Sequence, residues 1–147
     1  MGLDMYLRAK RYIGQYRDVD RDPPIVADID RLDLPFRVTD VTMLVKYWRK
    51  ANAIHDWFVV NVQAGKDNCR EYYVSRDQLT ELLALCLSVK DDPSKAEELL
   101  PTKIGFFFGA IEYDAGYFQD IDETIEALEK ALKADTDTLD FYYEASW

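Results

Sequence analysis

The chain has very little of several residue types that would point directly to a function. Its 147 residues include two cysteines and one histidine, and Cys69 and Cys86 do not form a CxxC motif. Such sparse cysteines indicate neither a disulfide framework nor a zinc site. No run of 18 or more apolar residues occurs, and the first residues carry an early acid in place of the apolar core of a secretory signal. We therefore expect a reduced, cytoplasmic protein that does not enter a membrane.

Motifs for catalysis and for tightly bound cofactors are also missing. There is no glycine-rich phosphate-binding motif and no Gly-x-Ser-x-Gly nucleophile elbow. Residues 18–22 begin like a calcium loop, but Pro23 stands where that loop needs glycine and Ile29 where it needs glutamate. His55 and Cys69 could act as a nucleophilic pair only if the fold brought them together. We expect no metal, no cofactor and no catalytic residue, so a binding protein is favoured over an enzyme, with a small hydrolase left open.

Acidic residues are abundant and unevenly distributed. The net charge is −10, and residues 112–147 contribute eleven acids against two lysines, a balance of −9. Residues 1–111 hold seventeen acids and sixteen bases, which leaves the remaining −1. The C-terminal region would repel nucleic acid, so direct nucleic-acid binding is not expected. A strongly acidic surface suits either solubility or a basic protein partner.

The most informative segment is residues 47–59, YWRKANAIHDWFV, which holds the histidine and two of the three tryptophans. Its periodicity predicts a helix that begins at Tyr47 and ends near Gly65. Trp48, Asn52 and His55 would lie at the border between the core and solvent, where an aromatic ring, an amide and an imidazole could form a small pocket. Basic residues nearby could meet a phosphate. The predicted ligand-binding residues are Trp48, Arg49, Asn52, His55, Arg70 and Tyr72.

The order of the remaining patterns predicts one α+β domain over residues 1–147, with a small, mostly antiparallel sheet packed against three to four helices. Residues 14–35 are rich in aspartate and proline and predict one long loop, of a length that is often mobile or functional. Two capping boxes are predicted, at Ser75–Gln78 and at Ser94–Glu97. The other expected elements are strands at 3–13, 71–74, 104–109 and 139–143, and helices after Ser75, after Ser94 and over 118–132. Residues 36–46 form either a strand or the run into the helix at Tyr47.

Several segments together resemble a family of small bacteriophage and prophage proteins for which no activity is established. The resemblance spans nearly the whole chain and implies an accessory protein that acts inside an infected or lysogenic bacterium. It implies a setting and no mechanism. The segments are residues 1–7 (MGLDMYL), 47–55 (YWRKANAIH), 67–69 (DNC), 71–75 (EYYVS), 99–101 (LLP), 105–109 (GFFFG), 112–114 (EYD), 141–143 (FYY) and 146–147 (SW).

The leading hypothesis is an accessory protein that binds a host bacterial protein, such as a component of a defence system, and inhibits or modulates it through an acidic and aromatic surface. The alternatives are a protein that binds or sequesters a nucleotide in the Trp48–His55 region, or an acidic mimic of nucleic acid. A homo-oligomer is also compatible with the sequence. The predicted partner-binding residues are Tyr113, Tyr117, Glu123, Glu126 and Glu129.

Overall fold

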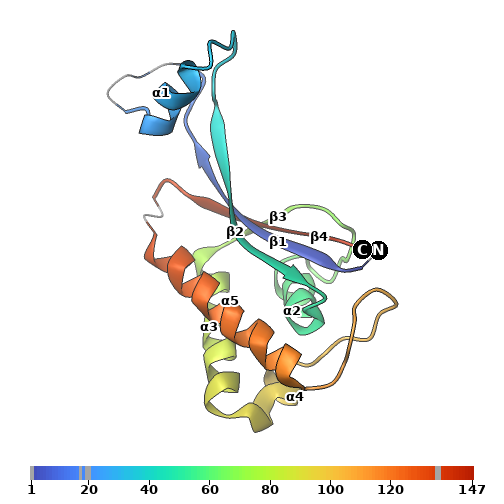
Figure 1. The fold of residues 1–147 in the computed structure, drawn as a ribbon. Coiled ribbons are helices and arrows are strands. Elements are labelled where there is room, and N and C mark those ends of the chain that lie inside the picture. The colour runs from blue at the N-terminus through green and yellow to red at the C-terminus, as the bar shows by residue number, and fades with distance from the viewer. Residues whose placement is uncertain (1, 17, 19–20, 135–136) are drawn as a thin grey trace.

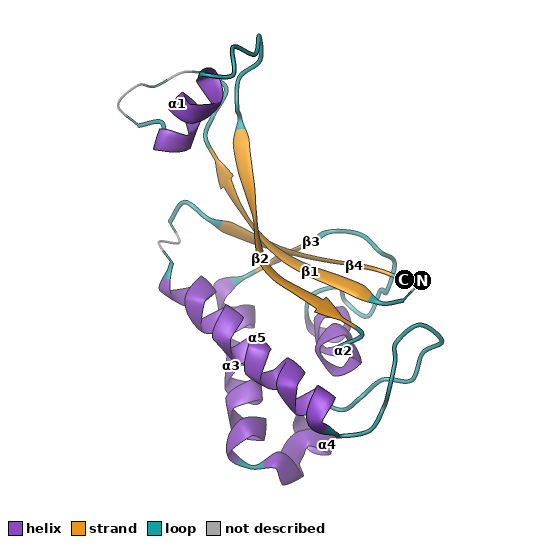
Figure 2. Cartoon of the chain, viewed as in Figure 1, coloured by secondary structure: helices purple, strands orange, loops and turns teal. Residues whose placement is uncertain are grey.

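The computed structural model has an α+β architecture in which one antiparallel sheet is covered by helices (Figures 1 and 2). It describes residues 2–16, 18, 21–134 and 137–147. The four strands lie in the order β2-β1-β4-β3, and each neighbouring pair is antiparallel. The elements are β1 (Asp4–Tyr12), α1 (Pro24–Asp30), β2 (Asp40–Arg49), α2 (Asn52–Asn61), β3 (Tyr72–Val74), α3 (Arg76–Asp91), the 3-10 turn η1 (Pro93–Lys95), α4 (Ala96–Leu99), α5 (Ala115–Lys133) and β4 (Asp140–Ser146).

The central strands β1 and β4 form the floor of the core. In β1 the side chains of Met5 and Leu7 are fully buried, and in β4 Phe141 and Tyr143 are buried likewise. Residues between them face the other side of the sheet, where Arg8 forms an ion pair with Glu144 at 2.7 Å. Because successive side chains of a strand point to opposite faces, this alternation places one face under the helices and leaves the other solvated.

The two predicted long helices are present, and α5 begins at Ala115, three residues before the predicted start. Ser75 and Gln78 form the predicted reciprocal capping box at the start of α3, with N–O distances of 3.1 and 2.9 Å. Along α5, Ile121, Ile125 and Leu128 are buried, at the spacing that places apolar residues on one helix face. The second predicted capping box is wrong, because the turn η1 is capped by Asp92, whose carboxylate accepts from the Ser94 N–H.

The predicted helix start at Tyr47 is also wrong. Strand β2 continues through Arg49, and α2 begins at Asn52. Tyr47 pairs with Tyr6 and Trp48 with Met5 across the sheet, so the pairing with β1 overrides the helical periodicity of this segment. Trp48 consequently lies in the core, where its indole N–H donates to the Thr124 hydroxyl at 2.8 Å.

Residues 104–109 form an exposed loop with a turn at 106–108, and the predicted central strand there is wrong. Gly109 has a φ of 87°, which a strand does not allow. At Gly105, a Cβ atom would lie 2.5 Å from the ring of Phe108, so the tight turn requires glycine. Ile104 and Phe106 are consequently exposed.

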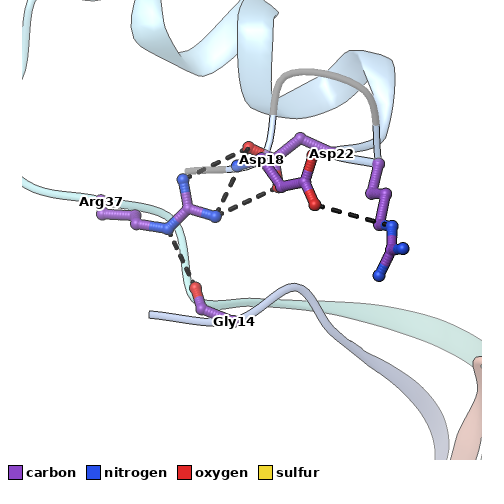
Figure 3. A network of polar contacts seen from close by, with 5 residues as sticks. Gly14, Asp18, Asp22 and Arg37 are labelled. Carbon is purple, nitrogen blue, oxygen red and sulfur yellow. Dashed lines mark hydrogen bonds and ion pairs between the residues drawn. The ribbon is translucent and has the colours of Figure 1, made fainter. Parts of the chain in front are cut away.

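The β1–β2 hairpin extends beyond the rest of the sheet and carries α1 at its end (Figure 1). We call residues 11–41 the arm, because β4 pairs with β1 only as far as Lys10. The predicted 14–35 loop is therefore partly helical, although residues 17, 19 and 20 lie outside the described residues. Arg37 organises the end of the arm, since it donates to the Gly14 carbonyl at 2.9 Å and to Asp22 at 3.1 Å (Figure 3). Val26 of α1 is buried against this end.

Candidate functional site

The predicted ligand-binding residues do not share one site. Trp48 is 2% exposed and His55 is 1% exposed, so neither ring is available to stack on a ligand. Tyr72 and Arg70 lie beside β3, where the Tyr72 hydroxyl donates to Asn68 at 3.2 Å. Arg49 and Asn52 lie together in the wall of a pocket between α2 and α5.

Asn52 holds the loop that follows α4. Its side-chain amide donates to the carbonyls of Phe108 and Ala110, at 3.0 and 2.8 Å, and its carbonyl accepts from the Lys103 N–H at 2.9 Å. All of these partners are backbone groups of one loop. Because its hydrogen-bonding capacity is largely used within the protein, Asn52 shapes the pocket and is not free to read a ligand edge.

His55 belongs to a buried network that connects β4, α2 and the loop before β3. Its Nδ1 lies 2.8 Å from the Tyr143 hydroxyl and its Nε2 lies 3.0 Å from Asp67 Oδ2. The other Asp67 oxygen accepts from the indole N–H of Trp147 at 3.0 Å. A neutral imidazole satisfies both contacts if Nε2 donates to Asp67 and Nδ1 accepts from Tyr143. Phe108 covers the His55 ring edge-on, with centroids 5.1 Å apart. The network therefore stabilises the fold and does not expose the imidazole to a ligand.

The pocket between α2 and α5 has a volume of about 330 Å³. We call it the α2–α5 pocket. Its walls come from the end of β2, the first turn of α2, the loop at 102–114 and the first turns of α5. The lining residues are Arg49, Lys50, Ala51, Asn52, Ala53, Ile54, Thr102, Gly109, Ala110, Glu112, Asp114, Gly116, Tyr117, Gln119, Asp120 and Ile121.

The charged residues of the pocket are of both signs. Arg49 is the last residue of β2 and Lys50 follows it, and Glu112, Asp114 and Asp120 come from the start of α5 and the loop before it. Partial burial raises the pKa of Asp120 to about 6, and the nearby Glu123 carboxylate adds to the shift. A carboxyl with a raised pKa inside a pocket is a feature that is common in functional sites.

The predicted partner-binding residues of α5 are less exposed than expected. Tyr117 is buried, and its hydroxyl donates to the Leu100 carbonyl at 2.8 Å. Tyr113 is half-buried, and its hydroxyl accepts from the Thr102 N–H. Neither ring stands free as an anchor for a partner. Acidic residues of α5 are partly neutralised by lysines, because Glu123 pairs with Lys46. Glu126 pairs with Lys130, and Glu129 is exposed.

A surface that the sequence did not indicate lies on the arm. Large apolar side chains are exposed along it and at its base, and Tyr16 and Phe36 are 86% and 79% exposed. The aspartates and prolines of residues 14–35 indicated a loop. The signal for this surface was the number of large apolar residues within that loop. The exposed apolar residues of the arm and its base are Tyr12, Tyr16, Ile25, Leu32, Leu34, Phe36, Met43 and Leu44.

Comparison of the chain with family models, with curated proteins and with solved structures gave no match. Among the described residues, no group of three or more His, Cys, Asp and Glu side chains is arranged so that it could hold a metal ion. No helix in the described part of the chain is long and apolar enough to span a bilayer. The arm is therefore the feature from which a function is inferred.

Proposed function

We propose that this protein acts by binding another protein, and that the arm makes the principal contact. The observation that carries the proposal is the concentration of large exposed aromatic and aliphatic side chains on the arm and at its base. Single exposed apolar residues are ordinary, but many large ones on one projecting segment are typical of an interaction site. Aromatic side chains such as Tyr16 and Phe36 also contribute large contact areas at protein interfaces.

The total exposed area supports a partner of ordinary protein size. The chain exposes 9085 Å². A compact monomer of this mass exposes about 7,800 Å², so the excess is about 1,300 Å². A standard protein–protein interface buries about 800 Å² on each partner. The excess exposed area of the whole chain is therefore larger than one partner's share of a standard interface.

An apolar groove at the base of the arm would receive an anchor side chain from the partner. The groove has a volume of about 320 Å³ and lies between the arm and the residues before β4. Binding energy concentrates where an anchor fills such a pocket. It is lined by Arg11, Pro23, Ile25, Val41, Met43, Thr138 and Leu139.

The resemblance to bacteriophage and prophage proteins suggests a host bacterial protein as the partner. In that setting the protein would be an accessory factor that inhibits or modulates its target. The acidic residues Glu123, Glu126 and Glu129 would then contribute long-range attraction toward a basic partner surface. Contacts on the arm would contribute most of the affinity, because the tyrosines near α5 are largely buried.

The proposal is tested by replacing two exposed aromatic residues of the arm with serine, as Tyr16→Ser together with Phe36→Ser. Tagged wild-type and variant proteins would be cross-linked in a bacterial host, and the captured proteins identified by mass spectrometry. We expect a host protein that the wild type retains and the double variant loses. The matched control is Phe106→Ser, which removes a 95% exposed aromatic residue from a different loop and should leave capture unchanged.

Two results would contradict this proposal. Capture that survives the double variant but is lost with Phe106→Ser would move the contact from the arm to the 104–109 loop. A stable dimer in light scattering that becomes monomeric in the double variant would show that the arm binds a second copy of the chain, and the host-partner interpretation would be abandoned.

A further inference from the structure

The outer edge of β2 is the longest unpaired strand edge in the described part of the sheet. β2 has 10 residues and stands first in the strand order, so only β1 pairs with it (Figure 2). Helix α5 contacts β2 from the core side, through Trp48 and Lys46. On the opposite face the side chains of Thr42, Leu44 and Tyr47 are exposed. A long exposed edge offers a row of N–H and C=O groups to another strand, and β2 contains no proline that would interrupt this row.

Hydrogen bonds at the two ends of β2 show which of its residues point outward. The Lys50 N–H donates to the Leu3 carbonyl, and the Ile13 N–H donates to the Thr39 carbonyl, both at 2.8 Å. The backbone groups of Thr39 and Lys50 therefore point toward β1. Backbone groups alternate in direction along a strand. The residues whose backbone groups are open to a partner strand are thus Asp40, Thr42, Tyr47 and Arg49.

A bulge at the middle of β2 makes the strand complementary to itself. Leu7 pairs with Lys46 while Arg8 pairs with Leu44, so Val45 is an extra residue, and its side chain packs against the core. The bulge shifts the alternation by one residue. An antiparallel copy of β2 at full overlap therefore meets outward backbone groups with outward backbone groups, and solvent-facing side chains with solvent-facing ones. A bulge usually disfavours pairing at a strand edge, but this one lies at the midpoint and leaves both halves of the strand free to pair.

The charges of β2 match in the same arrangement. Full overlap of 40–49 with itself places Asp40 of one chain opposite Arg49 of the other, and opposite charges directly across two strands stabilise their pairing. Arg49 bonds Asp4 through one nitrogen at 3.1 Å, and its side chain is 54% exposed, so its other N–H groups can meet a second carboxylate. The third charged residue of the strand, Lys46, is paired with Glu123 at 2.5 Å. No like charges face each other across the edge.

We propose that the outer edge of β2 binds the same edge of a second copy of this chain, antiparallel and around a two-fold axis at the bulge. The two sheets join into one continuous sheet, and backbone hydrogen bonds between the two β2 strands supply much of the affinity. A second copy is the occupant because its own strand brings the complementary charges and the matching order of outward groups. This contact is separate from the one that the exposed aromatic residues of the arm make.

The first test is the mass of the full-length protein in solution, measured by sedimentation velocity across a dilution series. We expect a dimer. Asp40→Arg and Arg49→Asp each place like charges opposite each other, so each variant alone should dimerise at least tenfold more weakly. A mixture of the two variants restores opposite charges and should form a heterodimer about as strongly as the wild type, which also shows that both variants are folded. Arg70→Asp makes the same charge change at an exposed position before β3, and this matched control should dimerise normally.

A second test addresses the backbone contact. Thr42→Pro removes an N–H that points away from β1, so pairing within the chain is kept while pairing between copies loses a hydrogen bond. We expect a protein with the wild-type circular dichroism spectrum that dimerises at least tenfold more weakly, whereas Thr42→Ala should remain a dimer. The variant with both Tyr16→Ser and Phe36→Ser should also remain a dimer, which distinguishes this contact from capture of a host protein.

Three results would overturn the proposal. The first is a wild-type protein that is monomeric at every concentration of the series. The second is a mixture of Asp40→Arg and Arg49→Asp that forms no heterodimer, or single charge variants that dimerise as the wild type does. The third is a folded Thr42→Pro variant that dimerises as strongly as Thr42→Ala.

Discussion

The environment of His55, the single histidine of the chain, is unlike that of a reactive histidine. Both of its ring nitrogens have partners, Tyr143 on one side and Asp67 on the other, and the ring is 1% exposed. Tyr143 stacks on Phe58 with centroids 3.9 Å apart, so the network is continuous with the aromatic core. A buried polar group that is satisfied in this way contributes to a unique packing arrangement.

Replacing His55 should therefore destabilise the fold. His55→Ala leaves the buried Tyr143 hydroxyl without its partner and opens a cavity, at a cost of about 3 kcal/mol. Urea unfolding monitored by fluorescence would measure this loss in the free energy of unfolding. Asp67→Ala provides the comparison, because water can replace the partly exposed carboxylate, and about 1 kcal/mol is expected. Equal costs for the two variants would contradict a buried network centred on His55.

Asp120 should produce a specific pH dependence of stability. Its folded-state pKa of about 6 lies above the ordinary value of 3.8. The folded state therefore binds the proton more tightly, and the stability contributed by the protonated carboxyl is complete below about pH 4 and lost as the pH rises toward 6.

Asp120→Asn, which mimics the protonated form, should match the wild type near pH 3.5 and exceed its stability above pH 6. A gain of about 1 kcal/mol is expected after allowance for solvent screening of a partly exposed group. Thermal melts of both proteins from pH 3.5 to 8 would measure the difference. Asp122→Asn should show no such trend, and a stability difference for Asp120→Asn that stays constant across this range would contradict the assignment.

The loop between α4 and α5 depends on one side chain of α2. Asn52 makes three hydrogen bonds to the backbone of this loop, and the Leu3 N–H donates to the Phe107 carbonyl at 3.1 Å. These contacts hold the exposed Phe106 turn against the sheet and form one wall of the α2–α5 pocket.

Asn52→Ala should release this loop while leaving the helices folded. The Phe108 and Ala110 carbonyls and the Lys103 N–H lose their partner, at a cost of about 2 kcal/mol. Hydrogen exchange should accelerate within residues 102–114 and remain slow in α3 and α5. Asn61→Ala is the matched control, because the Asn61 side chain bonds to the Trp57 carbonyl within its own helix. Uniform acceleration over the whole chain would contradict a local role.

The arm is structurally separable from the body of the protein. Its end has its own buried residue, Val26, and its own polar contacts around Arg37 (Figure 3). The hairpin is still paired at its exit from the sheet, where the Ile13 N–H donates to the Thr39 carbonyl at 2.8 Å. Among the described residues, the arm contributes none to the hydrophobic core that lies below β1 and β4.

Residues 14–38 can therefore be replaced by Asn-Gly, which forms a tight hairpin turn between paired strands. We expect the shortened protein to fold with a free energy of unfolding within about 1 kcal/mol of the wild type. It should also have a smaller hydrodynamic radius and should lose the captured partner. Circular dichroism melts and size-exclusion chromatography would measure both properties. A shortened chain that fails to fold would show that the arm contributes to the core.

Local sequence patterns were sufficient to predict much of the framework. The alternation in β1 and β4, the capping box at Ser75 and the apolar spacing along α5 all depend on residues close together in the chain. Composition alone gave the acidic character of the C-terminal region. These features report backbone geometry and one-sided burial, which a helix or strand imposes within a few residues.

The arrangement of the candidate sites required contacts between distant residues. Pairing with Met5 and Tyr6 keeps Trp48 and Tyr47 in a strand, although their periodicity suits a helix. Packing against Leu100 buries Tyr117, and the α2–α5 pocket joins Lys50 to Asp120, seventy residues apart. The packing of distant elements decides the strand register, the burial of each side chain and which charges lie close together. Each of these depends on interactions between segments far apart in the sequence, which a local pattern does not include.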